Sequence, residues 1–406
     1  MEGIINSFPG YEYVRGEDGK MHNMYRGTDV GFGGYVYAEP GIYTNVALID
    51  VASMHPTSII RLNKLGEYTQ RYADLRQARV YIKHKDYKAA GELFDGKLKK
   101  YLTSDAEAKA LSTALKLPLN SFYGISDAGY SNPARDSRDK NNIIALRGAL
   151  FMRTLQDEVQ ERGFTVAHIK TDSIKIPNAT PEIIEFVMDF GKKYGYEFEH
   201  EATYERMCLV NDAVYIAKYA DGEHEYELPT GQKIKTAWTA TGAQFAVPYV
   251  FKSLFSGSDY IFKDFCETKS VSAGEMWIDM NEDLPEGEHD YIFVGRVGQY
   301  CPIREGRGGG EVFRKKDDKY YAVTGTKGFR WLESETVKAQ GKEGCIDMAY
   351  FTKLADAAVD KINEQGEKIG VTYEDFARGD IDILMGRKPL PDFMNLPEPE
   401  VDPIPF

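Results

Sequence analysis

One short stretch constrains this chain more than any other: an apolar strand that runs into an aspartate and is soon broken by a proline. Residues 45–52 read Asn-Val-Ala-Leu-Ile-Asp-Val-Ala, and Pro56 follows. An aspartate at the tip of a buried strand is costly unless a cation or hydrogen bonds satisfy it. Asp50 therefore predicts either a metal or polar partner at this point, or a purely structural turn.

A second stretch, residues 115–124, predicts a helix with three polar side chains on one face. Lys116, Asn120 and Tyr123 are spaced by four and three residues, so they lie on the same side. Pro118 lies within this helix, where it removes a backbone donor and clashes with the preceding turn. We therefore expect a kink between Lys116 and Asn120.

A third stretch, residues 166–176, predicts two strands joined by a tight turn at Thr171, Asp172 and Ser173. Aspartate and serine favour such turns because their side chains hydrogen-bond the local backbone. The pattern places a second carboxylate, that of Asp172, at the tip of a hairpin.

The composition predicts a soluble protein with a sizeable core and more than one domain. Of 406 residues, 42% are hydrophobic and 13% are aromatic. The sequence has no run of eighteen apolar residues and no signal-peptide pattern at its start, so we expect a cytoplasmic protein that does not bind a membrane. The four cysteines form no C-x-x-C pair, which argues against a disulfide framework or a zinc site.

The net charge of −13 disfavours a general nucleic-acid binder, because neutralising phosphates requires Lys and Arg. The basic residues are clustered, however, and acids concentrate near residues 275–290 and at the C-terminus. Local placement of charge therefore matters more than the total.

Taken in chain order, the three stretches resemble motifs A, B and C of family B DNA polymerases, in a phage-type variant. The segment D-x-x-S-x-x-P-T begins at Asp50, K-x3-N-S-x-Y-G begins at Lys116, and T-D-S begins at Thr171. The resemblance covers roughly residues 30–250. Few residues precede this region, so the chain resembles a polymerase core without the N-terminal exonuclease domain of the family.

The resemblance implies an α+β fold, a right-hand polymerase core with an antiparallel-sheet palm, helical fingers and a mixed thumb or C-terminal region. Helices are expected over residues 67–90, 141–162 and 181–194, and a further helix is expected to carry Lys97, Lys99 and Lys100. The expected domains are residues 1–60 (N-terminal segment and first part of the palm), 61–124 (fingers), 125–240 (palm), 241–388 (thumb or C-terminal domain) and 389–406 (disordered acidic tail).

The resemblance also implies a catalytic centre. Asp50 and Asp172 would be the catalytic residues and, with the Val51 carbonyl, would hold two Mg²⁺ ions as cofactors. Backbone N–H groups near the end of the Asp50 strand would cradle the triphosphate, and cations of the fingers would bind the same phosphates. The nucleotide-binding residues implied are Ser53, Met54, His55, Arg76, Arg79, Lys116, Asn120 and Tyr123. For Arg76 and Arg79 the alternative is an ordinary solvated basic stripe.

Two positions depart from the family. Where most relatives have a tyrosine that excludes a ribose 2′-hydroxyl, this chain has His55, so we expect weaker rejection of ribonucleotides. Lys170 replaces the first aspartate of an Asp-Thr-Asp form of motif C. In an extended strand residues 170 and 172 share a face, so Lys170 would lower the pKa values of the carboxylates and compete with metal. Altered metal demand, or an inactive enzyme, would follow.

A set of DNA contacts is implied as well. Gly33, Gly34 and Tyr35 correspond to a template-binding element, with a plain hairpin loop as the alternative. Tyr215, Lys218 and Tyr219 correspond to an element that holds the primer end, with an ordinary edge strand as the alternative. The complete predicted set is Gly33, Gly34, Tyr35, Gly124, Lys170, Ser173, Tyr215, Lys218 and Tyr219.

Two C-terminal stretches suggest further partners. Residues 291–331 combine strands with glycines, cations and aromatics, which could clasp a duplex backbone or form a solvated loop. Residues 398–406 resemble the acidic Ile-Pro-Phe tails of bacterial single-stranded-DNA-binding proteins, which dock on replication partners.

The leading hypothesis is a template-directed DNA polymerase of phage replication that extends a primer 3′ end. Its partners would be primer-template DNA, dNTPs, and a separate exonuclease subunit or processivity factor, in the host cytoplasm. One alternative is a non-catalytic DNA-binding or scaffold subunit of a replisome, favoured by Lys170, the negative charge and the tail. Another is a primase-like or repair nucleotidyltransferase.

Overall fold

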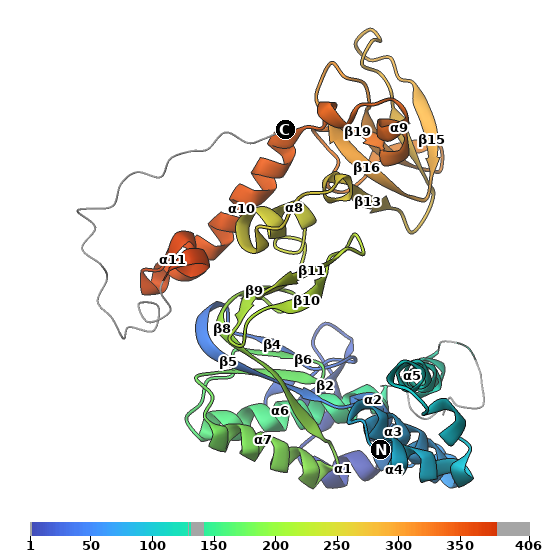
Figure 1. The fold of residues 1–406 in the computed structure, drawn as a ribbon, viewed down its shortest axis with the longest axis vertical. Coiled ribbons are helices and arrows are strands. Elements are labelled where there is room, and N and C mark those ends of the chain that lie inside the picture. The colour runs from blue at the N-terminus through green and yellow to red at the C-terminus, as the bar shows by residue number, and fades with distance from the viewer. Residues whose placement is uncertain (1, 129, 131–141, 380–406) are drawn as a thin grey trace. The chain divides into compact units, whose positions relative to one another are not determined.

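The structure is a computed structural model that describes residues 2–128, 130 and 142–379. The chain divides into two compact units, Met1–Tyr204 and Glu205–Phe406, which are treated separately below (Figure 1). The division falls within the range 125–240 that was expected to form a palm. The assignment of ranges to palm, fingers and thumb stays a prediction, and the predicted tail lies outside the described residues.

The described part of the first unit contains similar numbers of helices and strands. In chain order they are α1 (Glu2–Ser7), β1 (Glu12–Arg15), β2 (Met21–Tyr25), β3 (Thr28–Asp29), β4 (Val36–Ala38), β5 (Gly41–Val51), α2 (Met54–Arg61), α3 (Thr69–Lys83), α4 (Tyr87–Glu92), α5 (Asp105–Asp127), α6 (Ile143–Glu161), β6 (His168–Lys170), β7 (Ser173–Pro177), α7 (Pro181–Tyr194) and the start of β8 (Phe198–Asn211).

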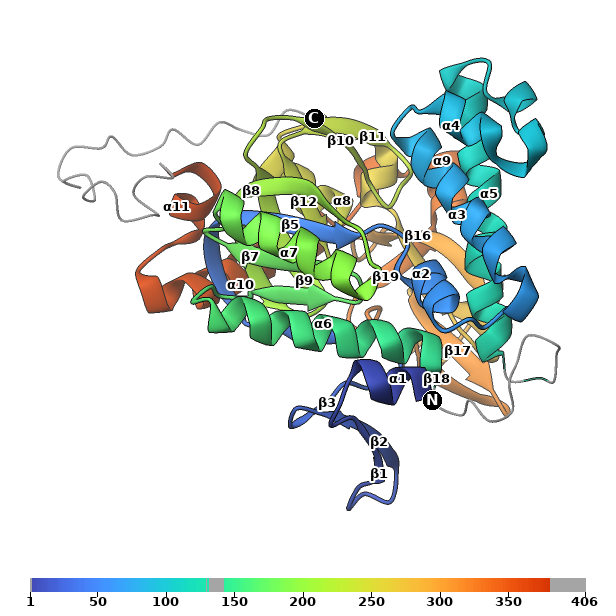
Figure 2. The ribbon, with the colours of Figure 1, turned by 90° about the horizontal axis from the view of Figure 1, so that it is seen from below.

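An antiparallel sheet organises this unit, in the order β8-β5-β7-β6-β4. Figure 2 shows α6 and α7 lying across one face of it. Successive residues of a strand point to opposite faces, and the register pairs Ile49 with Ile174 and Asp50 with Ser173. The isoleucines enter the hydrophobic core with α6 and α7, so Asp50 and Ser173 lie on the other, polar face.

The strongest helix predictions are confirmed. The helix expected over 141–162 is α6, which ends at Glu161. Gly163 follows with a left-handed φ of 83°. The helix expected over 181–194 is α7, whose N-cap Thr180 accepts a hydrogen bond from the Ile183 N–H.

Predictions between residues 67 and 124 need correction. The helix expected over 67–90 is split into α3 and α4 at Lys85, which has a φ of 60°. The helix expected around Lys97 is replaced by short 3-10 turns, because Phe94 and Asp95 adopt left-handed conformations. Helix α5 begins after the N-cap Ser104 and continues through Pro118 as one element.

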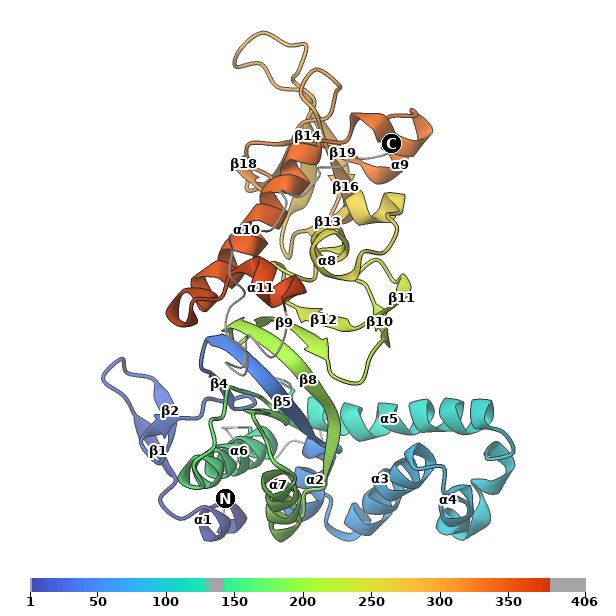
Figure 3. The same ribbon diagram turned by 60° about the vertical axis from the view of Figure 1, so that its left-hand side comes forward.

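Helices α3, α4 and α5 form a subassembly of their own beside the sheet (Figure 3). Their contact is a small apolar cluster that includes Ala78 and Ile82 of α3, Ala90 of α4, and Leu115 of α5. This packing fixes which face of α5 is turned away from α3 and therefore left for polar side chains.

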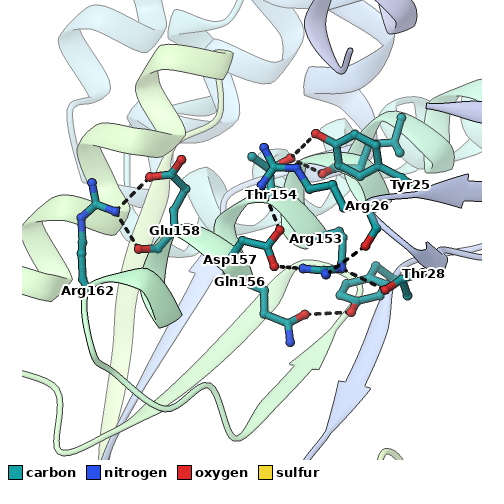
Figure 4. Close-up of polar contacts among 11 residues, drawn as sticks. Tyr25, Arg26, Thr28, Arg153, Thr154, Gln156, Asp157, Glu158 and Arg162 are labelled. Atoms are coloured by element: carbon teal, nitrogen blue, oxygen red, sulfur yellow. Dashed lines mark hydrogen bonds and ion pairs between the residues drawn. The ribbon is translucent and has the colours of Figure 1, made fainter. Parts of the chain in front are cut away.

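The small sheet β1-β2-β3 is attached to α6 by polar contacts (Figure 4). Arg26 forms an ion pair with Asp157 at 2.9 Å, and the Tyr25 hydroxyl lies 3.1 Å from that of Thr154. Arg153 pairs with Asp157 from within the same helix. These contacts hold the N-terminal strands to the helix that supports the main sheet.

The second unit is mainly β. It contains the end of β8 and then β9 (Val214–Tyr219), β10 (His224–Glu227), β11 (Lys233–Thr236), β12 (Trp238–Thr241), α8 (Pro248–Phe251), β13 (Glu267–Ser270), β14 (Glu275–Asp279), β15 (Tyr291–Gly295), β16 (Val297–Ile303), β17 (Glu311–Lys316), β18 (Lys319–Ala322), β19 (Arg330–Glu333), α9 (Ser334–Ala339), α10 (Met348–Gly366) and α11 (Tyr373–Arg378).

Strand order in this unit is β12-β9-β8, β10-β11, β13-β16-β19 and β15-β14-β17-β18. Its core gathers Met276, Ile278 and Val312 with Trp331 and Phe351. The predicted α+β class with antiparallel sheets is thus confirmed for the chain. Within the described ranges, no helix combines the length and the apolar character that crossing a bilayer requires.

Candidate active site

A cavity of about 860 Å³ lies in the first unit, where β5 ends and the β6–β7 turn begins. Its described lining comes from β5, α2, α3, the α3–α4 turn, the start of α4, α5, the β6–β7 turn and β8. The lining residues are Asp50, Val51, Ala52, Ser53, Met54, His55, Pro56, Arg79, Val80, Ile82, Lys83, Lys85, Tyr87, Asp105, Lys109, Ser112, Lys116, Asn120, Tyr123, Asp172, Glu199 and Glu201.

The structure brings Asp50 and Asp172 together at this cavity, although they are far apart in sequence. The Val51 N–H donates to the Asp172 carbonyl at 2.9 Å, and Asp50 pairs with Ser173 across β5 and β7. The turn itself is tight, because Thr171 has a φ of 57° and the Asp172 N–H donates to the Lys170 carbonyl at 2.7 Å. Both carboxylates are partly buried.

The carboxylate of Asp50 is repelled by the negative charges of Asp172 and Glu201. Burial, together with these negative charges, raises the pKa of Asp50 to about 7. Burial also raises the pKa of Asp172. The hydrogen bond from its own backbone N–H and the charges of His55 and Lys175 act in the opposite direction and lower this pKa. A bound cation would relieve this repulsion.

Lys175, rather than Lys170, is the cation built into this site. Its side chain is buried, and burial lowers its pKa to about 8 even though Asp50 and Asp172 pull the pKa upward. Its Nζ lies 3.1 Å from His168 Nδ1. The role of Lys175 was not predicted from the sequence, although this lysine alternates with isoleucines in the strand Ser173–Pro177.

The predicted role of Lys170 is therefore wrong in its geometry. Residues 170 and 172 do not belong to one extended strand, because β6 ends at Lys170 and a turn follows. Lys170 is exposed, and the described lining of the cavity does not include it. The alternation rule applies only within a strand.

Cations line the wall opposite the carboxylates. Arg79 and Lys83 of α3 and Lys109 and Lys116 of α5 all face the cavity. Arg79 donates to the Ser53 hydroxyl at 3.4 Å. The predicted shared face of Lys116, Asn120 and Tyr123 is present in the cavity lining.

Arg76 is not one of the cations that line the cavity. Its guanidinium is largely buried and lies 3.2 Å from a Glu197 carboxylate oxygen and 3.3 Å from the Ala52 carbonyl. The described lining of the cavity does not include it. The expectation that Arg76 binds phosphates is corrected, since Arg76 joins α3 to the sheet.

Two acids of β8 were not anticipated. Glu199 and Glu201 alternate along the strand and both line the cavity. Glu199 forms an ion pair with Lys83, and the Ala52 N–H donates to the Glu197 carbonyl at 2.8 Å. The signal for them was a strand with an acid at every second position, beginning at Glu197.

The first turn of α2 presents its backbone to the cavity. Ser53 precedes the helix with a left-handed φ of 64°, and among the described residues its side chain caps no N–H of that turn. The Met54 side chain points the other way and packs on Gly148, where an added Cβ would lie 2.6 Å from the Met54 sulfur. Only the backbone of Met54 is left for a ligand.

His55 and Tyr123 form a stacked pair at the cavity. Their ring centroids are 4.1 Å apart with an angle of 4° between the planes. The Tyr123 hydroxyl accepts a hydrogen bond from Asn142 at 2.9 Å. The buried Nδ1 of His55 has no hydrogen-bond partner within the described residues, and burial lowers the pKa of this histidine.

The predicted template element has structural roles. A Cβ at Gly34 would lie 2.4 Å from the Thr171 hydroxyl, so glycine lets this loop approach the motif C turn. The Tyr35 ring is buried and its hydroxyl donates to Gln156 at 2.8 Å, so the expected DNA contact of this side chain is corrected. Gly33 and Gly124 are exposed.

The predicted primer-end residues belong to the second unit. Tyr215, Lys218 and Tyr219 lie on β9, which is flanked by β8 and β12 and is therefore not an edge strand. Lys218 forms an ion pair with Glu205 at 3.2 Å. The DNA-binding role of these residues stays a prediction.

The donor set at the cavity fits Mg²⁺. In the described ranges, no group of three or more His, Cys, Asp or Glu side chains is arranged to hold a metal. Mg²⁺ does not need such a cage, since it is usually held by one or two carboxylates and completes its shell with water and substrate phosphates. Asp50 and Asp172, with their mutual repulsion, are such a pair.

Comparison with known protein sequences gives a partial match. No family model matches the sequence. A stretch of 209 residues is 23% identical to DNA polymerase 2 of Aeropyrum pernix and covers 46% of this chain and 26% of that protein. The chain thus spans about a quarter of the length of this curated relative. Over part of its length it is similar to an archaeal DNA polymerase.

A comparison with solved structures gives a partial superposition. The matched structure is the family B DNA polymerase from the hyperthermophilic archaeon Pyrobaculum calidifontis, with a TM-score of 0.44 and 13% sequence identity. The superposition covers 87% of this chain and 49% of that chain.

Proposed function

We propose that this chain is a family B DNA polymerase that extends a primer 3′ end on a DNA template, in phage DNA replication. The observation that carries the proposal is the meeting of Asp50 and Asp172 at one cavity that a wall of cations completes. The similarity to an archaeal DNA polymerase supports it.

Asp50, Asp172 and the Val51 carbonyl would hold two Mg²⁺ ions. When bound, such ions lower the pKa of the primer 3′-hydroxyl and stabilise the leaving pyrophosphate. The protein's own contribution is to hold two carboxylates side by side in a partly buried place, where the pKa of each is raised and a bound cation would favour the ionised forms. Lys175 also favours the ionised form of Asp172 through its charge.

The triphosphate would lie between α2 and the fingers helices. Met54 and His55, at the start of α2, line the cavity, and their N–H groups would favour an anion, as helix N-termini do. Arg79, Lys83 and Lys116 face them from α3 and α5. Because Lys83 is paired with Glu199, nucleotide phosphates would have to compete with this carboxylate.

The stacked pair of His55 and Tyr123 would contact the sugar and base of the incoming nucleotide. The pair presents a flat surface, and Asn120 lines the cavity one turn before Tyr123. His55 lines the cavity and has a smaller ring than tyrosine, which is the physical basis for weaker rejection of ribonucleotides.

Primer extension by the purified chain tests the proposal. Asp172→Asn keeps the size of the side chain and removes its charge, so we expect incorporation of dNTPs to fall by at least about a thousandfold. Asp189→Asn is the matched control, because Asp189 is an exposed acid of the same unit that pairs with Lys192. Equal activity of Asp172→Asn and wild type would contradict the proposal.

A non-catalytic DNA-binding subunit is the second candidate, favoured by the buried Lys175, which supplies a positive charge without a metal. It predicts that wild-type protein binds primer-template DNA and incorporates no nucleotide at any Mg²⁺ concentration. Extension by wild type that is lost in Asp172→Asn would exclude it.

A further inference from the structure

The sheet β15-β14-β17-β18 of the second unit has two very different faces (strands β14 and β18 are labelled in Figure 3). Met276 and Ile278 of β14 and Val312 of β17 point into the core of the unit. The residues between them point the other way, and the register places Trp277 beside both Phe293 and Phe313. The second face is therefore aromatic.

The rings on this face contact one another rather than the core. Tyr291 and Tyr320 come from the two edge strands and stack face to face, with centroids 3.8 Å apart and planes 6° apart. Trp277 packs edge-on against Phe293 at 5.3 Å. Phe293 is 55% exposed. In the described part of the unit, these rings lie outside the hydrophobic cluster that forms its core.

Positive charge accompanies the rings. Lys315 Nζ lies 5.8 Å from the centre of the Trp277 ring and 5.7 Å from that of Tyr320. It also lies 3.4 Å from the carboxylate of Asp318, which is 96% exposed. The hairpin β17–β18 further carries Arg314, Lys316 and Lys319, but the register places them on the opposite face, with Tyr321. Lys315 is thus the cation of the aromatic face.

The nearby acids are occupied within the protein. The Asp279 carboxylate lies 2.6 Å from His289 Nδ1 and accepts a hydrogen bond from the Asp290 N–H at 3.0 Å. Glu311 accepts one from the Gly328 N–H at 3.1 Å. Their charges are therefore partly compensated. Lys315 is half-buried next to the rings, and the exposed Glu275 pairs with it across β14 and β17.

We propose that this aromatic face binds single-stranded nucleic acid. Unpaired bases stack on aromatic side chains without regard to sequence, and neighbouring cations contact the phosphates between them. An antiparallel sheet that stacks bases on its open face is a known solution to this problem. A duplex hides the faces of its bases, so stacking rings favour an unpaired strand. The proposal uses no residue of the cavity and stands independently of the catalytic assignment.

Intrinsic fluorescence gives the sharpest test. The chain has three tryptophans, of which Trp238 and Trp331 are buried and Trp277 is partly exposed. An oligo-dT strand of roughly 16 nucleotides, the upper end of the site size of one single-strand-binding fold, should quench the emission of the full chain. In Trp277→Phe the quench should disappear while affinity, measured by anisotropy of a labelled strand, stays within about threefold.

Variants of the face extend the test. Phe293→Ala and Tyr320→Ala should each weaken binding of the same strand by at least about fivefold, the lower end of what one stacked base contributes. Tyr321→Ala is the matched control, because Tyr321 lies on the opposite face of the same hairpin and is 46% exposed. Its affinity should equal that of wild type. Circular dichroism and thermal unfolding identify any variant that fails to fold, and Trp277→Phe then carries the test.

Two outcomes would overturn the proposal. One is a quench and an affinity that are the same for duplex as for single strands and that do not change in Phe293→Ala. The other is a quench of Trp277 by a peptide of residues 389–406, which is rich in proline and acids, without any quench by oligo-dT. The face would then bind an extended peptide. Loss of primer extension in Asp172→Asn would leave the result of this test unchanged.

Discussion

Two sheets of this molecule have a similar backbone architecture but carry different side chains on their open faces. Each has one face buried in an apolar core and one face that carries chemistry. In the first unit that face holds Asp50 and Lys175 and leads to a cavity lined by acids and cations. In the second unit it holds stacked rings with Lys315 beside them.

The difference teaches what each surface can bind. Charges held in a partly buried cavity suit metal ions and phosphates, because low solvent exposure strengthens electrostatic interactions. Rings on an open sheet suit flat, uncharged groups such as nucleobases, because stacking requires area and not charge. A chain that carries both can handle the backbone and the bases of a nucleic acid at separate places.

The largest expected effect concerns Lys175, the buried charge that the aromatic face lacks. Its pKa is about 8 in the fold, below the ordinary lysine value of 10.5. Between these pH values the unfolded chain binds a proton that the folded chain does not, so stability rises with pH across this window. A shift of this size corresponds to about 3 kcal/mol.

Lys175→Met should therefore be more stable than wild type near pH 7, and the difference should shrink as pH rises from about 8 to about 10.5. Urea unfolding at several pH values in the presence of EDTA measures it. Lys170→Met, which removes an exposed lysine of the same hairpin, should show no such window. A constant difference across the window would show that Lys175 is not buried in its neutral form.

The next effect separates two neighbouring arginines of α3. Arg79→Ala should raise the KM for dNTPs by about 10- to 100-fold, the value of one charge-assisted hydrogen bond to a phosphate. Arg76→Ala should leave KM within about threefold and lower the stability, because Arg76 bonds Glu197 and the Ala52 carbonyl. Steady-state kinetics with denaturation curves distinguishes them. The reverse pattern would mean that Arg76 faces the nucleotide.

A smaller effect tests the loop beneath the motif C turn. Gly34→Ala adds a Cβ that would lie 2.4 Å from the Thr171 hydroxyl, so it should cost about 1–3 kcal/mol by overpacking. Gly33→Ala is the matched control, since a Cβ there would meet no described atom within 4 Å. Urea unfolding should place it within about 0.5 kcal/mol of wild type. Equal stability of the two variants would remove the packing role of Gly34.

The smallest effect concerns the choice of sugar. His55→Tyr should increase the preference for dNTPs over rNTPs by about tenfold, because a larger ring fills the space next to the sugar. The ratio of kcat/KM for the two nucleotides in primer extension measures the preference. An unchanged ratio would show that His55 does not contact the sugar.

Local patterns in the sequence were sufficient for much of the first unit. Helix α6 ends shortly before Gly163 and α7 begins just after its N-cap Thr180, because turn and cap residues act over a few positions. Asp50, Asp172 and the polar face of α5 could be placed at one site because the three stretches resemble motifs that share an active site in family B DNA polymerases.

Other features depend on contacts between distant residues. The left-handed Thr171 moves Lys170 away from the carboxylates and leaves Lys175 as the buried cation. The burial of Tyr35 depends on Gln156 of α6. The aromatic face exists only because the registers of β14, β15 and β17 place Trp277, Phe293 and Phe313 together. Pairing across strands is not encoded in local spacing.

The central claim is that Asp50 and Asp172 act as one unit, and a double-mutant cycle tests it most directly. Single-turnover primer extension would be measured for wild type, Asp50→Asn, Asp172→Asn and the double variant. If both carboxylates hold the same ions, each single change should cost at least about a thousandfold and the double change little more. Losses that multiply, or a single variant with full activity, would contradict the account.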